Sequence, residues 1–157
     1  MEIIQKESQE LLQLVSFNLG SEEFGIDILK VQEIIRLINI TKVPNSPEFI
    51  EGVINLRGRV IPVIALRIKL GMEKIEYSNS TRIIVVEINN NTVGFVVDGV
   101  SEVLRIPANI TEAPPSMVAG VDSEYITAVG KLEDRLLILL DLEKILAINE
   151  HEMLKNT

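Results

Sequence analysis

The sequence contains no cysteine and no tryptophan, and its single histidine is His151. Without cysteine there can be no disulfide, no thiolate nucleophile and no thiolate metal ligand. One histidine cannot build a histidine cluster for a metal ion, and His151 lies in a charged stretch with no visible partner to orient it as a base. We therefore predict that His151 is a solvated surface residue and that the chain carries no cofactor.

Long apolar runs are also missing. The longest, such as residues 136–140, fall far short of the roughly 20 residues that a bilayer crossing needs. The first seven residues do not combine a basic region with an apolar stretch, as a secretory signal would. We expect a cytoplasmic protein that does not insert into the membrane by itself.

Positive charge is scarce. Lys and Arg number 15 against 23 Asp and Glu, which gives a net charge of −8. Affinity for nucleic acid comes largely from Lys and Arg that displace condensed counterions, and aromatic side chains often supply stacking platforms. Only 4 Phe and 2 Tyr are present, without a basic platform around them. This composition argues against a nucleic-acid partner.

The abundant residues are β-branched. Ile and Val together far outnumber Ala, and branched side chains favour strands over helices. Alternating or continuous apolar segments predict strands at residues 12–19, 53–56, 60–64, 82–88, 92–98 and 135–140. Ser46, Pro47 and Gly52 have the order of a helix cap, first turn and terminator, so we predict a short helix over residues 46–52. Asp141 is a candidate cap for a C-terminal helix. We predict an all-β or mostly-β fold.

The most informative feature is an internal duplication. At a spacing of 69 residues, four identities recur: Gly25/Gly94, Val31/Val100, Glu33/Glu102 and Arg36/Arg105. At a spacing of 76 residues, three more recur: Leu56/Leu132, Arg59/Arg135 and Leu66/Leu142. A shared apolar bias does not explain identical Gly, Glu and Arg. Because two copies are too few for a solenoid, we predict two small closed or nearly closed β units that share an apolar seam.

Local patterns single out few functional residues. Arg57 lies at a predicted hairpin tip, where its guanidinium could bind a partner carboxylate, whereas the second copy has Glu133 there. Val31 and Glu33 suit either a binding patch or, respectively, the core and the solvated surface. No spacing isolates one pair of carboxylates for acid–base catalysis.

Three segments together resemble one family. They are residues 22–34 (EEFGIDILKVQEI), 52–63 (GVINLRGRVIPV) and 94–100 (GFVVDGV). Their order and spacing are similar to those of CheW, the bacterial chemotaxis coupling protein, over about residues 12–148. The resemblance implies two pseudo-symmetric five-stranded antiparallel β-barrels that pack on a shared hydrophobic seam, plus a C-terminal helix.

This fold places the whole chain, residues 1–157, in one CheW-like domain. We expect subdomain one at about residues 15–80, subdomain two at about 10–14 and 81–148, and the C-terminal helix at about 141–154. We also expect the free protein to be monomeric.

The resemblance further implies a non-enzymatic scaffold that couples transmembrane chemoreceptors to a histidine kinase in signalling arrays. In the family, a groove between the barrels takes the cytoplasmic tip of a methyl-accepting chemoreceptor. The matching residues are Val31, Glu33, Gly52, Arg57, Thr81, Val100 and Val103. The kinase regulatory domain meets an apolar face that corresponds to Val15, Ile28, Val31 and Ile34. A second kinase contact, which closes rings, corresponds to Glu112, Pro114 and Met117.

Two positions depart from the family pattern. Ala65 stands where an Asp is usual, so one charge is missing near the end of a strand of the first barrel. Glu112 occupies a ring-contact position that can carry Arg in relatives. The alternative function is a carboxylate-dependent small hydrolase on a double β-barrel, which would need two carboxylates with displaced pKa values in a polar cleft.

Overall fold

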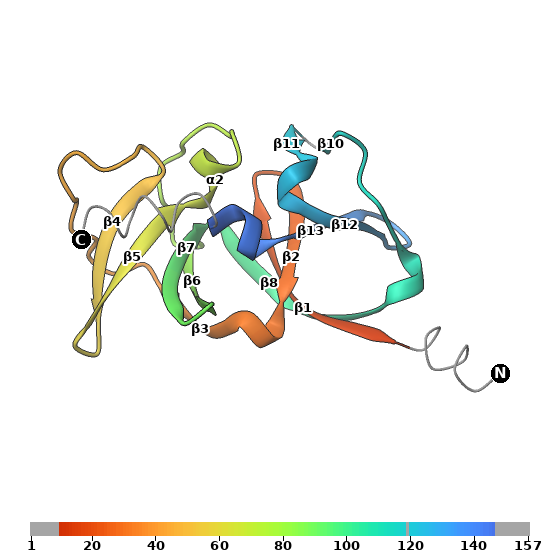
Figure 1. The fold of residues 1–157 in the computed structure, drawn as a ribbon, viewed down its shortest axis with the longest axis horizontal. Helices are drawn as coiled ribbons and strands as arrows, with labels where there is room; N and C mark the ends of the chain where they lie inside the picture. Colours follow the sequence, from red (N-terminus) through yellow and green to blue (C-terminus); the bar gives the residue numbers. More distant parts are fainter. Residues whose placement is uncertain (1–9, 119, 147–157) are drawn as a thin grey trace.

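The computed structural model describes residues 10–118 and 120–146. The chain is mostly β, as predicted, and its two main sheets lie side by side along the long axis (Figure 1). The six-stranded sheet has the order β8 (Gly99–Pro107), β1 (Leu11–Leu19), β2 (Glu22–Asp27), β13 (Leu136–Leu140), β12 (Ile126–Lys131) and β9 (Thr111–Glu112). The five-stranded sheet has the order β3 (Val31–Arg36), β6 (Arg82–Ile88), β7 (Asn91–Val97), β5 (Arg59–Ala65) and β4 (Ile50–Leu56).

Short elements join these strands. They are the hairpin of β10 (Met117–Val118) and β11 (Val121–Asp122) and the short helices η1 (Ile28–Lys30), α2 (Leu66–Lys69), η2 (Ala108–Ile110) and η3 (Ser123–Tyr125). We call the five-stranded sheet with α2 the five-stranded unit, and the six-stranded sheet with η2, η3 and the β10–β11 hairpin the six-stranded unit.

The apolar side chains divide into one shared core and two smaller ones. The shared core, here called the seam, takes residues from both sheets, including the stacked rings of Phe17 and Phe24, whose centroids are 5.8 Å apart. Each unit also has a small core of its own. Strand β6 contributes Ile84 and Val86 to the seam and Ile83 to the core of the five-stranded unit, because successive side chains point to opposite faces of a strand. The continuous apolar run of β6 therefore reflects a strand that is buried on both faces.

The strand registers carry the duplication. Phe17 pairs with Phe24 in the β1–β2 hairpin, and the positions 69 residues later, Val86 and Val93, pair in the β6–β7 hairpin. The β-bulges recur as well. In β3 the pairing register shifts between Val31 and Glu33, and in β8 it shifts next to Val100, the residue equivalent to Val31. Identical registers and repeated bulges show that the two copies have one architecture.

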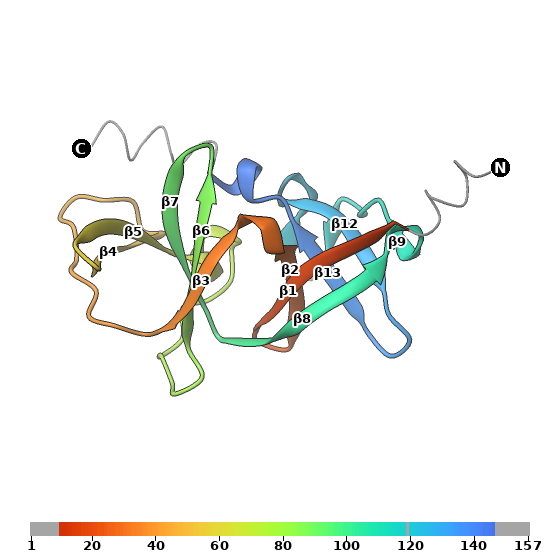
Figure 2. The same cartoon turned by 90° about the horizontal axis from the view of Figure 1, so that it is seen from below.

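The copies exchange strands. β3 follows β2 in sequence but pairs with β6 of the other sheet, and β8 follows β7 but pairs with β1. Figure 2 shows these two crossovers between the sheets, at η1 and at the β7–β8 junction. The expected subdomain boundaries differ from this division, because β1 and β2 belong to the six-stranded sheet and β6 and β7 to the five-stranded one. The sheet that a strand joins depends on its backbone pairing with strands of the other copy. Local sequence does not reveal this pairing.

One predicted helix is wrong. Residues 46–49 form no helix, and β4 begins at Ile50, which pairs with Ile64 of β5. Gly52 does not end a helix: it has a φ of 150°, and a Cβ there would lie 2.3 Å from the carbonyl oxygen of Thr41, which bridges to Val53. Long-range pairing thus overrides the local cap signals.

The C-terminal helix is present over residues 142–146. Asp141 caps it as predicted, since its carboxylate accepts a hydrogen bond from the backbone N–H of Lys144 at 3.2 Å. The remainder of the expected helix, and His151, lie outside the described residues.

Candidate functional site

Arg57 and Glu33, both singled out from the sequence, are paired with each other. Arg57 sits at the β4–β5 turn with a φ of 53°, and Asn55 supports this turn by accepting the N–H of Gly58 at 2.9 Å. The guanidinium of Arg57 donates two hydrogen bonds to the Glu33 carboxylate, at 2.5 and 2.8 Å. These bonds hold the pKa of the Glu33 carboxyl below its ordinary value and raise the pKa of Arg57. The turn therefore presents one preformed, exposed ion pair.

Apolar residues flank this pair on β3, an edge strand of its sheet. Ile34 is 40% exposed, whereas Val31 is half-buried against the seam. Ile28 of η1 is likewise half-buried against the seam. β3 thus combines a fixed charge with apolar surface that is open to a partner.

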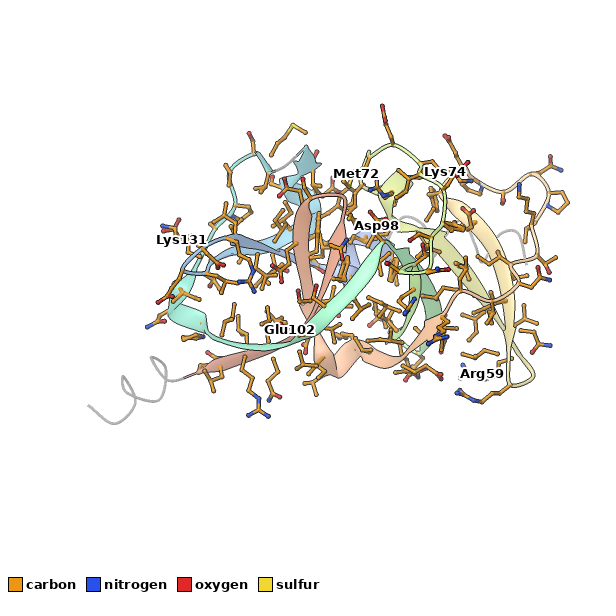
Figure 3. All side chains as sticks on the ribbon, turned by 180° about the vertical axis from the view of Figure 1, so that it is seen from behind. Arg59, Met72, Lys74, Asp98, Glu102 and Lys131 are labelled. Carbon is orange, nitrogen blue, oxygen red and sulfur yellow. The ribbon has the colours of Figure 1, made fainter. Side chains whose placement is uncertain are left out.

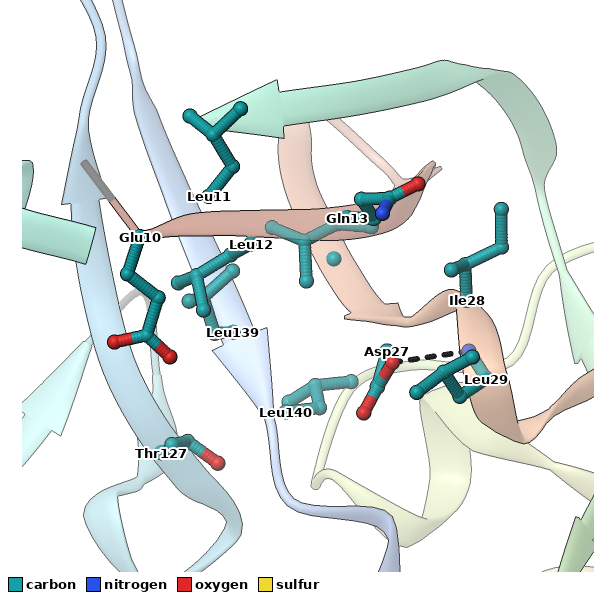
Figure 4. Close-up of a pocket in the computed structure, with 12 residues that line it drawn as sticks. Glu10, Leu11, Leu12, Gln13, Asp27, Ile28, Leu29, Thr127, Leu139 and Leu140 are labelled. Atoms are coloured by element: carbon teal, nitrogen blue, oxygen red, sulfur yellow. Dashed lines mark hydrogen bonds between the residues drawn. The ribbon is translucent and has the colours of Figure 1, made fainter. Parts of the chain in front are cut away.

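A cleft of about 440 Å³ opens beside η1 (Figure 4). Strands β1, β2 and β13 supply its walls, and the carboxylate of Asp27 accepts the backbone N–H of Leu29 at its edge, at 2.9 Å. The lining is mostly apolar: Leu11, Leu12, Leu14, Ile28, Leu29, Leu139 and Leu140. Leu29 is 87% exposed. Sequence reasoning missed Leu29 and this cleft; the available signal was the Asp27 cap followed by two apolar residues.

The expected receptor residues do not all reach the surface. Gly52 and Thr81 are buried, and the Thr81 hydroxyl accepts the N–H of Ser78 at 2.8 Å. Val103 on β8 is 55% exposed, and Val100 is half-buried against the seam. None of the seven expected receptor residues lines the cleft. Gly52 and Thr81 shape the fold around the site and offer a partner little surface.

Among the expected kinase residues, Val15 is buried in the seam. The ring-contact residues lie in the six-stranded unit, where Glu112 forms an ion pair with Lys131 at 2.5 Å. Met117 is exposed and Pro114 is half-buried. Ala65 is buried at the end of β5, so its small side chain packs inside the fold.

Among the residues that the structure describes, the carboxyl groups with clearly shifted pKa values, Glu33 and Asp98, are not those of an acid–base pair. Hydrogen bonds from Arg57 lower the pKa of Glu33. Burial raises the pKa of Asp98, but hydrogen bonds from Arg67 and from the Gly20 N–H outweigh it and leave the value lowered. A hydrolase acid needs the opposite shift. Within residues 10–118 and 120–146, no group of three His, Cys, Asp or Glu side chains could hold a metal ion, and no helix is long and apolar enough to cross a bilayer.

Comparison with known proteins gives consistent results. The family model of the CheW-like domain matches residues 13–150. The chain is 44% identical over 140 residues to the chemotaxis protein CheW of Klebsiella aerogenes, covering 89% of this chain and 84% of that protein. It is 38% identical over 143 residues to CheW of Helicobacter pylori, covering 90% and 86%.

A solved structure is similar over nearly the same range. The crystal structure of the scaffolding protein TtCheW from Thermoanaerobacter tengcongensis matches with a TM-score of 0.82 and 39% identity, covering 89% of this chain and 95% of that one. The chain therefore belongs to the CheW-like family of non-catalytic chemotaxis scaffold proteins.

Proposed function

We propose that this protein couples membrane chemoreceptors to the chemotaxis histidine kinase by binding both at once. The observations that carry the proposal are the exposed ion pair and exposed apolar side chain on the edge strand β3, and the leucine-lined cleft beside η1, the short helix that leads into β3. Interfaces commonly place an apolar anchor next to charges that fix orientation. The apolar groups stabilise the complex by leaving water, and the charged groups fix the orientation of the partner. No covalent bond is made or broken.

The cytoplasmic tip of a methyl-accepting receptor is a helical hairpin, and we assign it to the cleft and to the exposed residue Val103 on β8. An apolar groove suits the apolar face of an amphipathic helix. Arg57 and Glu33, together with the half-buried Val31 and Val100, orient it. Gly52 and Thr81 act from inside the fold, because they are buried.

We assign the regulatory domain of the kinase to the apolar side of β3. Ile34 supplies the open anchor, and Ile28 and Val31 extend it. Val15 supports this face from the seam. Met117, Glu112 and Pro114 form the second kinase contact, at which the exposed Met117 offers an apolar side chain. In the cell the protein would be cytoplasmic and recruited to receptor arrays.

Co-sedimentation tests this function. Purified protein is mixed with receptor-containing membranes in the presence and absence of the kinase. We expect the protein to pellet with the receptors and to bring the kinase with it. Failure to pellet in either mixture would overturn the proposal. A variant in which Leu29 is replaced by Asp places a charge at the cleft without touching the core, so it should reduce receptor pelleting while kinase binding stays intact.

A further inference from the structure

We propose that the ion pair between Asp98 and Arg67 is a lock that sets the angle between the five-stranded and six-stranded units. The inference concerns the free chain and does not depend on the partners assigned above. By fixing the angle, the lock makes Asp98 and Arg67 positioning residues for surfaces that lie on both units.

The fold brings the two residues together at a crossover. β5 and β7 are parallel neighbours in which Ala65 pairs with Val96. Arg67 and Asp98 each follow two residues later, so they emerge at the same edge of the sheet. Arg67 belongs to α2 of the five-stranded unit, whereas Asp98 is the link at which the chain crosses to β8. Figure 3 places Asp98 near the middle of the molecule and Arg59 and Lys131 toward its two ends.

Asp98 is bonded to both units. Its carboxylate accepts hydrogen bonds from Arg67 Nη2 at 2.5 Å and Nε at 2.9 Å. The same carboxylate accepts the backbone N–H of Gly20, in the β1–β2 turn of the six-stranded unit, at 2.6 Å. The backbone N–H of Asp98 donates to the carbonyl oxygen of Asn18 at 3.1 Å. One side chain thus joins α2 of one unit to a turn of the other.

The local packing fits this arrangement. Side-chain exposure is only 15% for Arg67 and 16% for Asp98. Gly20 has a φ of 61°, and a Cβ there would lie 3.4 Å from Arg67 Nη2, so the turn approaches the guanidinium closely. Arg67 Nη1 also donates to the carbonyl oxygen of Glu73 at 2.9 Å, which holds the guanidinium in place. Charge-assisted bonds in such a sheltered place are strong and directional.

The seam is apolar, and the hydrophobic effect that holds it together is non-directional. The charge-assisted hydrogen bonds at Asp98 add a directional contact between the two units. Lys69, also on α2, lies 4.9 Å from the ring centre of Phe49 and 5.5 Å from that of Tyr125 in η3, so α2 touches the six-stranded unit a second time. Around the other crossover, at η1, the inter-element ion pair is Lys30 with Glu143 at 3.6 Å, and it is far more exposed. The ion pair at the Asp98 crossover is therefore the shorter and the more sheltered of the two.

The absence of cysteine makes the test direct. Val60 and Leu136 occupy equivalent positions in the two copies, one in each unit, and both are exposed. Spin labels are attached to a full-length V60C, L136C variant, and the distance distribution between them is measured. In the Asp98→Asn variant we expect this distribution to widen and its mean to shift, while circular dichroism and the thermal transition still report a folded chain.

The control is Lys74→Ala. Lys74 forms an ion pair with Glu51 at 3.4 Å, but both residues belong to the five-stranded side of the molecule, so its loss should leave the distribution unchanged. Arg67→Met removes the guanidinium but keeps an apolar side chain. It replaces Asp98→Asn in the distance measurement if that variant does not fold. Arg67→Lys keeps one point charge, so its distance distribution should be narrower than that of Arg67→Met and closer to that of the wild type. Wild-type distributions in folded Asp98→Asn or Arg67→Met would overturn the lock, and so would equal widening in Lys74→Ala.

Discussion

The guanidinium of Arg57 holds the carboxylate of Glu33 through two parallel hydrogen bonds, between the β4–β5 turn and strand β3. Two residues that the sequence marked separately are therefore one structural group. Arg57 takes a positive φ at the turn, and its guanidinium reaches the Glu33 carboxylate on β3, an edge strand of the sheet. A partner meets this pair with its geometry already fixed.

Replacing Arg57 by Glu is expected to weaken receptor coupling and spare folding. The new carboxylate would lie near that of Glu33 in a solvent-exposed place. The two negative charges would repel each other, and the apolar cores would not be disturbed. Receptor pelleting and the thermal midpoint are measured together. Arg59→Glu is the control, since Arg59 is exposed at the same turn but bonds to Thr92 at 2.9 Å. Full coupling in Arg57→Glu, or an unfolded protein, would contradict the prediction.

Replacing Ile34 by Asp is expected to lower affinity for the kinase regulatory domain. Loss of a central apolar anchor costs about 2 kcal/mol or more of binding, which is roughly thirtyfold. The free energy of unfolding should fall by only about 1 kcal/mol, because the side chain is 40% exposed and the main loss is the lower strand propensity of Asp. Calorimetric titration and urea denaturation provide the two values. An unchanged dissociation constant would remove Ile34 from the kinase face.

Gly94→Ala is expected to destabilise the fold more than Gly25→Ala, although the two glycines are equivalent in the duplication. A Cβ at Gly94 would lie 2.8 Å from Cγ2 of Ile83, a stiff β-branched side chain. A Cβ at Gly25 would meet the more flexible Leu139 at 3.2 Å. Overpacking of this kind costs about 1–3 kcal/mol. Urea denaturation measures both variants, and a smaller loss for Gly94→Ala would refute the packing argument.

Acid should remove the contribution of Asp98 to stability. Burial raises its pKa, but the hydrogen bonds from Arg67 and Gly20 outweigh burial and leave the folded-state pKa below the ordinary value of 3.8. A lowered carboxyl pKa stabilises the folded state above the unfolded-state value, and this stability is lost as the pH falls through the folded-state pKa. The difference in unfolding free energy between wild type and Asp98→Asn should therefore be constant near neutrality and narrow below about pH 4. Urea denaturation across this pH range checks the trend. A difference in unfolding free energy that grows as the pH falls would contradict the prediction.

The sequence predicted local features where one side chain is enough to decide the structure. Asp141 caps its helix, and the turn at Arg57 forms where Gly58 permits a φ of 84°. The wrong helix at residues 46–52 and the displaced subdomain boundaries have one cause. In both, strand pairing decides the structure: Ile50 pairs with Ile64 of the next strand, so β4 extends back into the predicted helix, and Glu33 pairs with Val85 in the other half of the chain.

By itself, the sequence determined the β-rich class, the duplication, the shared apolar seam and the family, because composition and repeated residues are properties of the chain alone. The tertiary structure alone decided which copy each strand pairs with, which expected site residues are buried, and the meeting of Arg67 with Asp98. These depend on hydrogen bonds between distant strands, whose register is set by how whole apolar faces pack. Because many residues set the register together, no single position of the sequence reveals it.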